Sequence, residues 1–114
     1  MVQEKAPESQ FDFGRMVVNL GTYVVLVDEE SVELTFSEFE LLRRFCEEPD
    51  RIIDYETLCH GVWRAVGPLF KRRLAVSICR LRAKLGDISP YRLETVRGRG
   101  YGLLHRREKR AANA

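Results

Sequence analysis

The segment from Arg72 to Leu85 combines a row of cationic side chains with a regular apolar spacing. At about 100° per residue, four apolar residues fall on one narrow, core-facing stripe of a helix: Leu74, Ile78, Leu81 and Leu85. The opposite side carries one apolar residue, Val76, among four cations: Arg72, Arg73, Arg80 and Lys84. Within the segment, none of these cations has an acidic residue at the spacing that forms ion pairs along a helix. The pattern predicts a helix that binds a polyanion.

The residue types on that side suit the major groove of double-stranded DNA. Arg80 lies at its centre and can donate two hydrogen bonds to a guanine, a contact worth about 1–3 kcal/mol of discrimination. Val76 can pack against a thymine methyl group, and Ser77 can bond a phosphate or a base edge. The alternative is a surface helix whose arginines are merely solvated.

A second cationic site follows near the C-terminal end of the sequence. Two short apolar runs, 93–96 and 101–104, flank Arg97-Gly98-Arg99-Gly100, which predicts a β-hairpin with a glycine-containing turn. Beside a basic helix, this turn can act as a wing whose arginines, Arg97 above all and Arg99 beside it, meet the narrow and strongly negative minor groove. Gly98 and Gly100 would let the backbone approach without steric conflict. The alternative is a tight turn with two solvated arginines.

Three further residues have both a structural and a functional interpretation. Trp63 is expected to pack in the core, and its indole N–H could also meet a phosphate. Tyr101 is expected to pack under the wing with its hydroxyl available to a phosphate. Thr95 lies on the wing strand, where strand propensity alone would also explain it.

The elements that must position these residues follow from apolar spacing and turn residues. Residues 11–34 are rich in β-branched and aromatic side chains in four runs: Phe13, 16–20, 23–27 and 32–34. Turns at 21–22 and 28–31 help to divide them into a small antiparallel meander. A helix follows, with Thr35 or Ser37 as its N-cap and Pro49-Asp50 at its end. Ile52-Ile53 is long enough only for a bridging strand.

Two more helices complete the predicted order. Asp54 can cap a helix from Tyr55 to about Trp63, and the loop at 67–68 leads to the cationic helix, from about Phe70 to Leu85. Gly86 stands where a glycine commonly ends a helix. Two helices, a loop and a third, charged helix form a helix-turn-helix-like unit, and the hairpin makes it a winged helix of the α+β class.

Length and charge agree with this arrangement. A chain of 114 residues is expected to form one domain. Residues 1–50 hold 4 Lys or Arg against 12 Asp or Glu, and residues 51–114 hold 15 against 5, so balances of −8 and +10 underlie the net charge of +2. Such asymmetry favours a polyanion-binding end. We expect the domain to cover 11–104, between a linker or disordered lead at 1–10 and a mobile basic tail at 105–114.

The remaining residues offer no other chemistry. Cys46, Cys59 and Cys79 lack metal or redox spacing and are expected to be buried free thiols. His60 and His105 have no nucleophile or metal-ligand partner at a recognisable spacing, so we expect no enzymatic site, metal or cofactor. With no secretory signal and no apolar run approaching about 18 residues, the expected location is a reducing cytoplasm, without a membrane partner.

Four stretches in a fixed order carry a family resemblance: Leu34-Thr35-x-x-Glu38-Phe39-x-Leu41-Leu42, Leu58-x-x-x-Val62-Trp63, the helix from Arg72 to Leu85, and Thr95-Val96-Arg97-Gly98-x-Gly100-Tyr101. Together they resemble the OmpR/PhoB-type winged-helix DNA-binding domain over about Phe11 to Leu104. The resemblance implies a four-stranded N-terminal antiparallel sheet, three helices and a C-terminal β-hairpin wing. It also implies the effector domain of a bacterial two-component response regulator that binds specific double-stranded DNA near the nucleoid.

The resemblance also assigns roles by position. It implies phosphate contacts for four residues: Trp63, Arg72, Thr95 and Tyr101. It implies a groove-facing set of Arg73, Val76, Ser77 and Arg80, with Arg82 as a flanking cation and Arg97 in the minor groove. The segment 64–71 corresponds to one that meets RNA polymerase in some members. Such domains usually bind direct repeats as head-to-tail pairs, with a phosphorylated receiver domain driving dimerisation.

The sequence departs from the family pattern on the groove-facing side. Where the family helix commonly has Thr, Asp and His, this chain has Arg73, Ala75 and Ser77, so no target sequence is carried over. Gly102 stands where many members have an arginine. No receiver-like sequence precedes Phe11, which indicates either an excised effector domain or a regulator whose input lies elsewhere. The alternative function is a winged-helix interaction module that docks an acidic partner.

Overall fold

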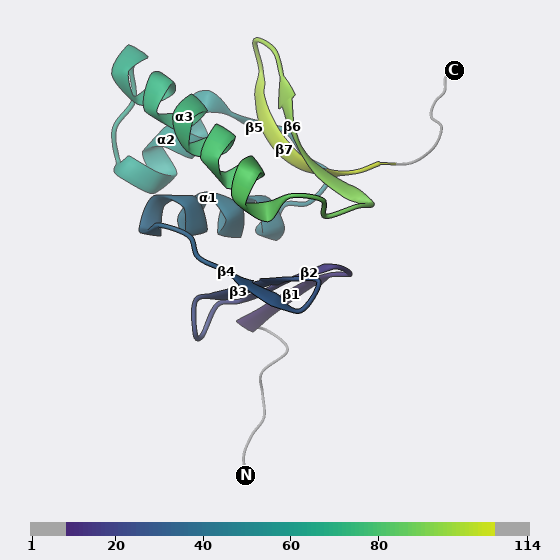
Figure 1. Cartoon of the computed structure of the whole chain (residues 1–114). Helices are drawn as coiled ribbons and strands as arrows, with labels where there is room; N and C mark the ends of the chain where they lie inside the picture. Colours follow the sequence, from purple (N-terminus) through teal and green to yellow (C-terminus); the bar gives the residue numbers. More distant parts are fainter. Residues whose placement is uncertain (1–8, 107–114) are drawn as a thin grey trace, which may run out of the picture.

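The computed structural model describes residues 9–106, which form two small sheets and three helices (Figure 1). The first sheet is an antiparallel meander in sequence order: β1 (Gln10–Phe13), β2 (Met16–Asn19), β3 (Val24–Val27) and β4 (Glu30–Val32). The helices are α1 (Phe36–Glu47), α2 (Tyr55–Trp63) and α3 (Pro68–Leu85). The second sheet has the antiparallel order β5-β7-β6, formed by β5 (Ile53–Asp54), β6 (Tyr91–Val96) and β7 (Gly100–His105). This is the predicted α+β winged helix.

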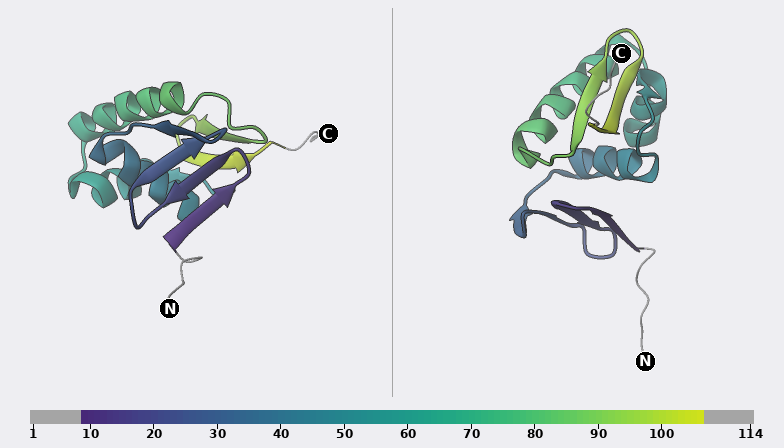
Figure 2. Two further views of the ribbon diagram at one scale, coloured as in Figure 1. Left: turned by 60° about the horizontal axis from the view of Figure 1, so that its bottom comes forward. Right: turned by 90° about the vertical axis from the view of Figure 1, so that its right-hand side faces the viewer.

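Helix α1 lies between the four-stranded sheet and the rest of the domain (Figures 1 and 2). Its buried Leu42 and Phe45 belong to the same core as Met16 and Val18 of β2. Helix α3 contributes the predicted apolar stripe, because Leu74, Ile78, Leu81 and Leu85 are each at most 4% exposed. The stripe fixes the rotation of α3 about its axis and therefore decides which residues face outward. None of the helices within residues 9–106 is long and apolar enough to cross a membrane.

Local capping signals place the first two helices. Thr35 is the N-cap of α1: its hydroxyl accepts the Glu38 backbone N–H at 3.2 Å, and Glu38 Oε1 accepts the Thr35 N–H at 2.9 Å. This reciprocal pair is a capping box. Asp54 caps α2 by accepting the Thr57 N–H at 2.7 Å. Of the two predicted N-cap candidates for α1, the structure shows Thr35 rather than Ser37, and it confirms Asp54 as the N-cap of α2.

The turn between β3 and β4 is shorter than the predicted four residues at 28–31. Asp28 and Glu29 have φ values of 51° and 69°, as a two-residue type I′ hairpin requires, so β4 already begins at Glu30. The Arg15 guanidinium supports this turn by pairing with Asp28 at 2.7 Å, and it also pairs with Asp87, after α3, at 3.1 Å. In the preceding turn Tyr23 has φ 60°, so β3 starts one residue later than predicted.

Other boundaries also differ from those predicted. Helix α3 starts at Pro68 rather than near Phe70, because proline at the first helical position is preset for helical φ and needs no N–H partner there. The loop before it therefore covers only 64–67. Strand β1 includes Gln10 and β7 includes His105, each one residue beyond the predicted domain limits of 11–104. Residues 1–8 of the predicted lead and 107–114 of the predicted tail lie outside the described residues.

Two glycines of β7 allow β5 to lie against it. A Cβ atom at Gly100 would overlap the Ile53 carbonyl oxygen, and one at Gly102 would overlap the Arg51 carbonyl oxygen. The expectation that Gly100 serves close approach to DNA is therefore corrected, since the approaching backbone is the protein's own. The close approach of the Arg51 carbonyl oxygen to Gly102 gives a physical reason for glycine rather than arginine at that position.

Candidate nucleic-acid interface

The outward side of α3 is a cationic surface whose charges are available to a ligand. Arg72, Arg73 and Arg80 are exposed there, and Val76 is 44% exposed among them. Ser77 is half-buried and lies nearer the edge of this surface. Among residues 9–106, neither Arg72 nor Arg80 forms an ion pair with another described residue. Arg72 and Arg80 can donate hydrogen bonds to phosphate oxygens or to acceptors on the bases without first breaking an ion pair within the described part of the protein.

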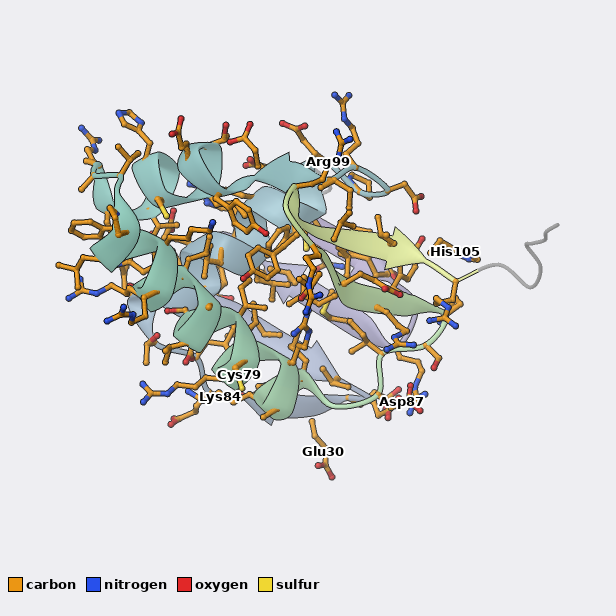
Figure 3. The ribbon with its side chains drawn as sticks, turned by 90° about the horizontal axis from the view of Figure 1, so that it is seen from above. Glu30, Cys79, Lys84, Asp87, Arg99 and His105 are labelled. Atoms are coloured by element: carbon orange, nitrogen blue, oxygen red, sulfur yellow. The ribbon has the colours of Figure 1, made fainter. Side chains whose placement is uncertain are left out.

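Cys79 also lies on the exposed side of α3, which corrects the expectation that it is buried. It follows buried Ile78 by one residue, and about 100° of helical rotation carries it out of the core. Figure 3 labels it on α3 together with Lys84. Cys46 and Cys59 are buried as predicted. Burial raises the pKa of Cys46 to about 12 and also raises that of Cys59.

Arg73 and Trp63 meet on the side of α3 that faces α2. The Arg73 guanidinium carbon lies 5.9 Å from the centre of the Trp63 ring and 5.4 Å from that of Phe70. The two rings are 6.2 Å apart. Trp63 is half-buried against the core, as expected. The cation–π contact restrains Arg73 while leaving its N–H groups at the surface.

Arg82 connects α3 to the wing strand instead of standing free beside α3. Its Nε donates to the Leu93 carbonyl oxygen at 2.7 Å, and its Nη2 donates to the Thr95 hydroxyl. Arg82 and Thr95 were both expected to contact DNA, and in the structure they are hydrogen-bonded to each other. The Arg82 side chain holds the part of β6 from Leu93 to Thr95 against α3.

Lys84 has an acidic partner from outside its own helix. Its Nζ lies 2.7 Å from Glu38 Oε1, and Glu38 is only 3% exposed. The expectation concerned spacing along the helix, where it holds, whereas Glu38 comes from α1. The ion pair and the capping box share the same carboxylate, so it ties the start of α1 to the end of α3.

The Glu38 carboxylate should make stability depend on acid pH. Burial raises its pKa, but hydrogen bonds from Lys84 and Thr35 together outweigh burial and bring the pKa below its ordinary value. A pKa lower in the folded than in the unfolded state stabilises the fold above the unfolded value, about 4.3, and that stability is lost as pH falls through the folded value. Between about pH 6 and pH 3, thermal unfolding should therefore shift less in Glu38→Gln than in wild type.

Circular dichroism melts across this range provide the measurement. Glu33→Gln is the matched control, because Glu33 is exposed and forms no ion pair with another described residue. An identical pH dependence in wild type and Glu38→Gln would contradict the assignment.

The wing carries its arginines at an exposed turn. The Arg99 N–H donates to the Val96 carbonyl oxygen at 2.9 Å, and Gly98 takes a φ of 76° at the third position, as in a type II turn. Arg97 and Arg99 are exposed, and among the described residues neither is ion-paired. Figure 3 shows Arg99 at the tip of the wing.

Tyr101 packs beneath this turn, as expected, and is only 7% exposed. Burial raises the pKa of its hydroxyl. Its ring meets the edge of Tyr55 from α2, with centres 5.7 Å apart. The Tyr55 hydroxyl in turn accepts the Gly98 N–H at 3.1 Å. Sequence analysis did not single out Tyr55, because its contact joins residues that are far apart in the chain.

Comparison with known proteins agrees with the fold. The family model described as "Transcriptional regulatory protein, C terminal" matches residues 28–103. Regulatory protein VanR of Enterococcus faecium is 32% identical over 91 residues, covering 75% of this chain and 38% of VanR. The chain spans between 38% and 45% of the length of such curated relatives.

Two solved structures are similar over most of the domain. The DNA-binding domain of Escherichia coli CpxR has a TM-score of 0.77 and 27% identity, covering 86% of this chain and 98% of that one. The Klebsiella pneumoniae RstA DNA-binding domain, solved in complex with the RstA box, has a TM-score of 0.74 and 28% identity, covering 83% and 96%. The chain belongs to the family of C-terminal domains of transcriptional regulatory proteins, of the OmpR/PhoB winged-helix type. This is a family of transcription regulators rather than enzymes.

Proposed function

We propose that this domain binds specific double-stranded DNA as the effector part of a bacterial two-component response regulator. The observation that carries the proposal is the pair of exposed arginine-bearing surfaces, one on α3 and one at the wing tip, connected through the hydrogen bonds of Arg82 and Tyr55. Helix α3 lies in the major groove and the wing arginines reach the minor groove. The relationship to the RstA domain solved with the RstA box supports the same interpretation. This function places the protein in the cytoplasm with the nucleoid.

The side chains divide into docking and sequence-discriminating groups. Arg72 and the wing arginines neutralise phosphates or the negative minor groove, while Val76 and Arg80 meet base edges from the exposed side of α3. Ser77 and Arg73 border the same surface and can contact the backbone or a base. Phosphate contacts from Thr95, which is exposed, and from the half-buried Trp63 and the buried Tyr101 supplement these groups. Arg82 and Lys84 act mainly through the internal contacts that orient α3 and the wing.

Two substitutions should separate these groups. Arg80→Ala should weaken binding to the preferred site by about 1–3 kcal/mol and relax its sequence preference, because a bidentate base contact is lost. Arg72→Ala should weaken all duplexes about equally and reduce the slope of log affinity against log salt by about 1. Fluorescence anisotropy with preferred and random duplexes, over a salt series, gives both quantities. Equal small effects of the two substitutions would contradict this division.

The duplex for these measurements can come from selection in a random pool. Selection also reports half-site spacing, and two direct repeats would support the head-to-tail pairing that the family resemblance implies. If random DNA is not bound even at low salt, an acidic protein becomes the better candidate for this cationic surface.

RNA polymerase is a second proposed partner, through segment 64–71. Val66 and Leu69 are 50% and 62% exposed there, an apolar exposure that suits a protein contact. Because Leu69 already belongs to α3, the loop and the first helical turn would form this contact together.

A further inference from the structure

One hydrogen bond connects the wing tip to the helix before α3. The Tyr55 hydroxyl accepts the backbone N–H of Gly98 at 3.1 Å, although the two residues are 43 positions apart. Gly98 stands between Arg97 and Arg99, the two cations of the turn. The position of this one backbone amide therefore sets where both arginine side chains begin.

The Tyr55 ring is itself held on two sides. Lys71 of α3 places its Nζ 4.4 Å from the ring centre, a cation–π contact. The Tyr101 ring of β7 meets Tyr55 at an interplanar angle of 81°. Tyr55 thus touches α3, the wing strand and the wing turn at once. Movement of its hydroxyl would require repacking against both neighbours.

Arg82 supports the strand of the wing rather than its turn. Its bonds to Leu93 and Thr95 hold this part of β6 against α3 and end two residues before Arg97. Beyond Thr95 the hairpin consists of Val96, the turn and the start of β7. The hydrogen bonds of Arg82 end before this tip, whereas Tyr55 bonds Gly98 within it, so the position of the tip depends on Tyr55. The two supports act on different parts of the wing and can be separated by mutation.

We propose that Tyr55 is a positioning residue that holds the wing tip at a set distance from α3. Arg97 and Arg99 then meet the minor groove while α3 occupies the neighbouring major groove. Because the turn is ordered before binding, less conformational freedom is lost when the complex forms. The inference rests on the proposed DNA-binding function and adds a residue that acts on the minor groove through the protein backbone.

The variant Tyr55→Phe removes the hydroxyl and keeps the ring, and Tyr23→Phe is its control. Tyr23 is 69% exposed in the turn between β2 and β3, outside the wing. In the free protein, amide hydrogen exchange of Gly98 should accelerate in Tyr55→Phe and stay unchanged in the control. Circular dichroism confirms that both variants fold.

The functional experiment uses the selected duplex with A·T, G·C or inosine·C pairs beneath the wing. Inosine·C lacks the guanine 2-amino group and therefore separates minor-groove from major-groove effects. Tyr55→Phe should lower affinity for the A·T and inosine·C duplexes by about two- to tenfold, the range of one net hydrogen bond. Its discrimination against base changes beneath α3 should remain that of wild type. In an Arg97→Ala background, Tyr55→Phe should have little further effect.

The outcomes are distinguishable. Selective loss of minor-groove discrimination together with faster Gly98 exchange supports the proposal. Unchanged Gly98 exchange, or equal loss of discrimination beneath the wing and beneath α3, overturns it while leaving DNA binding intact. Failure of the wild-type protein to bind any duplex overturns the proposed function first, and the role of Tyr55 in DNA binding with it.

Discussion

Leu81→Ala should lower the free energy of unfolding by about 2–5 kcal/mol. The Leu81 side chain is fully buried on the core-facing stripe of α3. Its truncation removes apolar contacts and leaves a cavity that the surrounding helices fill only in part. Because the stripe also sets which side of α3 faces outward, the loss should weaken DNA binding even at temperatures where the variant remains folded.

Val76→Ala is the matched control for Leu81→Ala. Val76 is on the same helix but 44% exposed, so its truncation should change stability by only about 0.5 kcal/mol or less. Urea unfolding of both variants, followed by circular dichroism, gives the comparison. Equal stability losses would mean that α3 is rotated relative to the placement described above.

Gly100→Ala should destabilise the protein by about 3 kcal/mol, at the upper end of the usual cost of overpacking. Besides overlapping the Ile53 carbonyl oxygen, the new Cβ would lie 2.8 Å from the Ile53 carbonyl carbon and 2.9 Å from Asp54 Cα. All three are backbone atoms, so no side-chain rotation relieves the overlap. Strand β5 must separate from β7, and the N-cap of α2 at Asp54 would move with it.

Gly14→Ala separates this overlap from ordinary backbone strain. Gly14 has φ 75° and open space where a Cβ would stand, so only the backbone preference opposes alanine, at a cost of about 1 kcal/mol. Thermal and urea unfolding measure both variants. A Gly100→Ala protein as stable as Gly14→Ala would contradict the close approach of β5.

Features that depend on near neighbours in the sequence could be predicted, and those that depend on distant partners could not. The caps at Thr35 and Asp54 and the apolar stripe of α3 are set within a few residues. The contacts from Lys84 to Glu38 and from Tyr55 to Gly98 join residues 46 and 43 positions apart, and no local pattern marks them. They exist because the end of α3 lies against the start of α1, and the wing turn lies against the start of α2.

The candidate site shows the same division in its individual residues. The outward placement of Arg72, Val76 and Arg80 follows from the helical spacing that buries Ile78. The Cys79 prediction failed because a general preference of cysteine for burial was given more weight than this spacing, which turns residue 79 away from the core. For Arg82, the family resemblance implied a flanking cation, and the position of β6 adds hydrogen bonds to Leu93 and Thr95 that no local spacing marks.

The exposure of Cys79 gives the protein a natural attachment point for a spectroscopic probe. Thiolates are the reactive form of cysteine, and the other two thiols are buried with raised pKa values. A maleimide dye added at neutral pH should therefore label the native domain at Cys79 alone. A fluorophore would then stand beside Arg80 without any cysteine being removed. Its emission can report, in real time, when a duplex comes to cover α3.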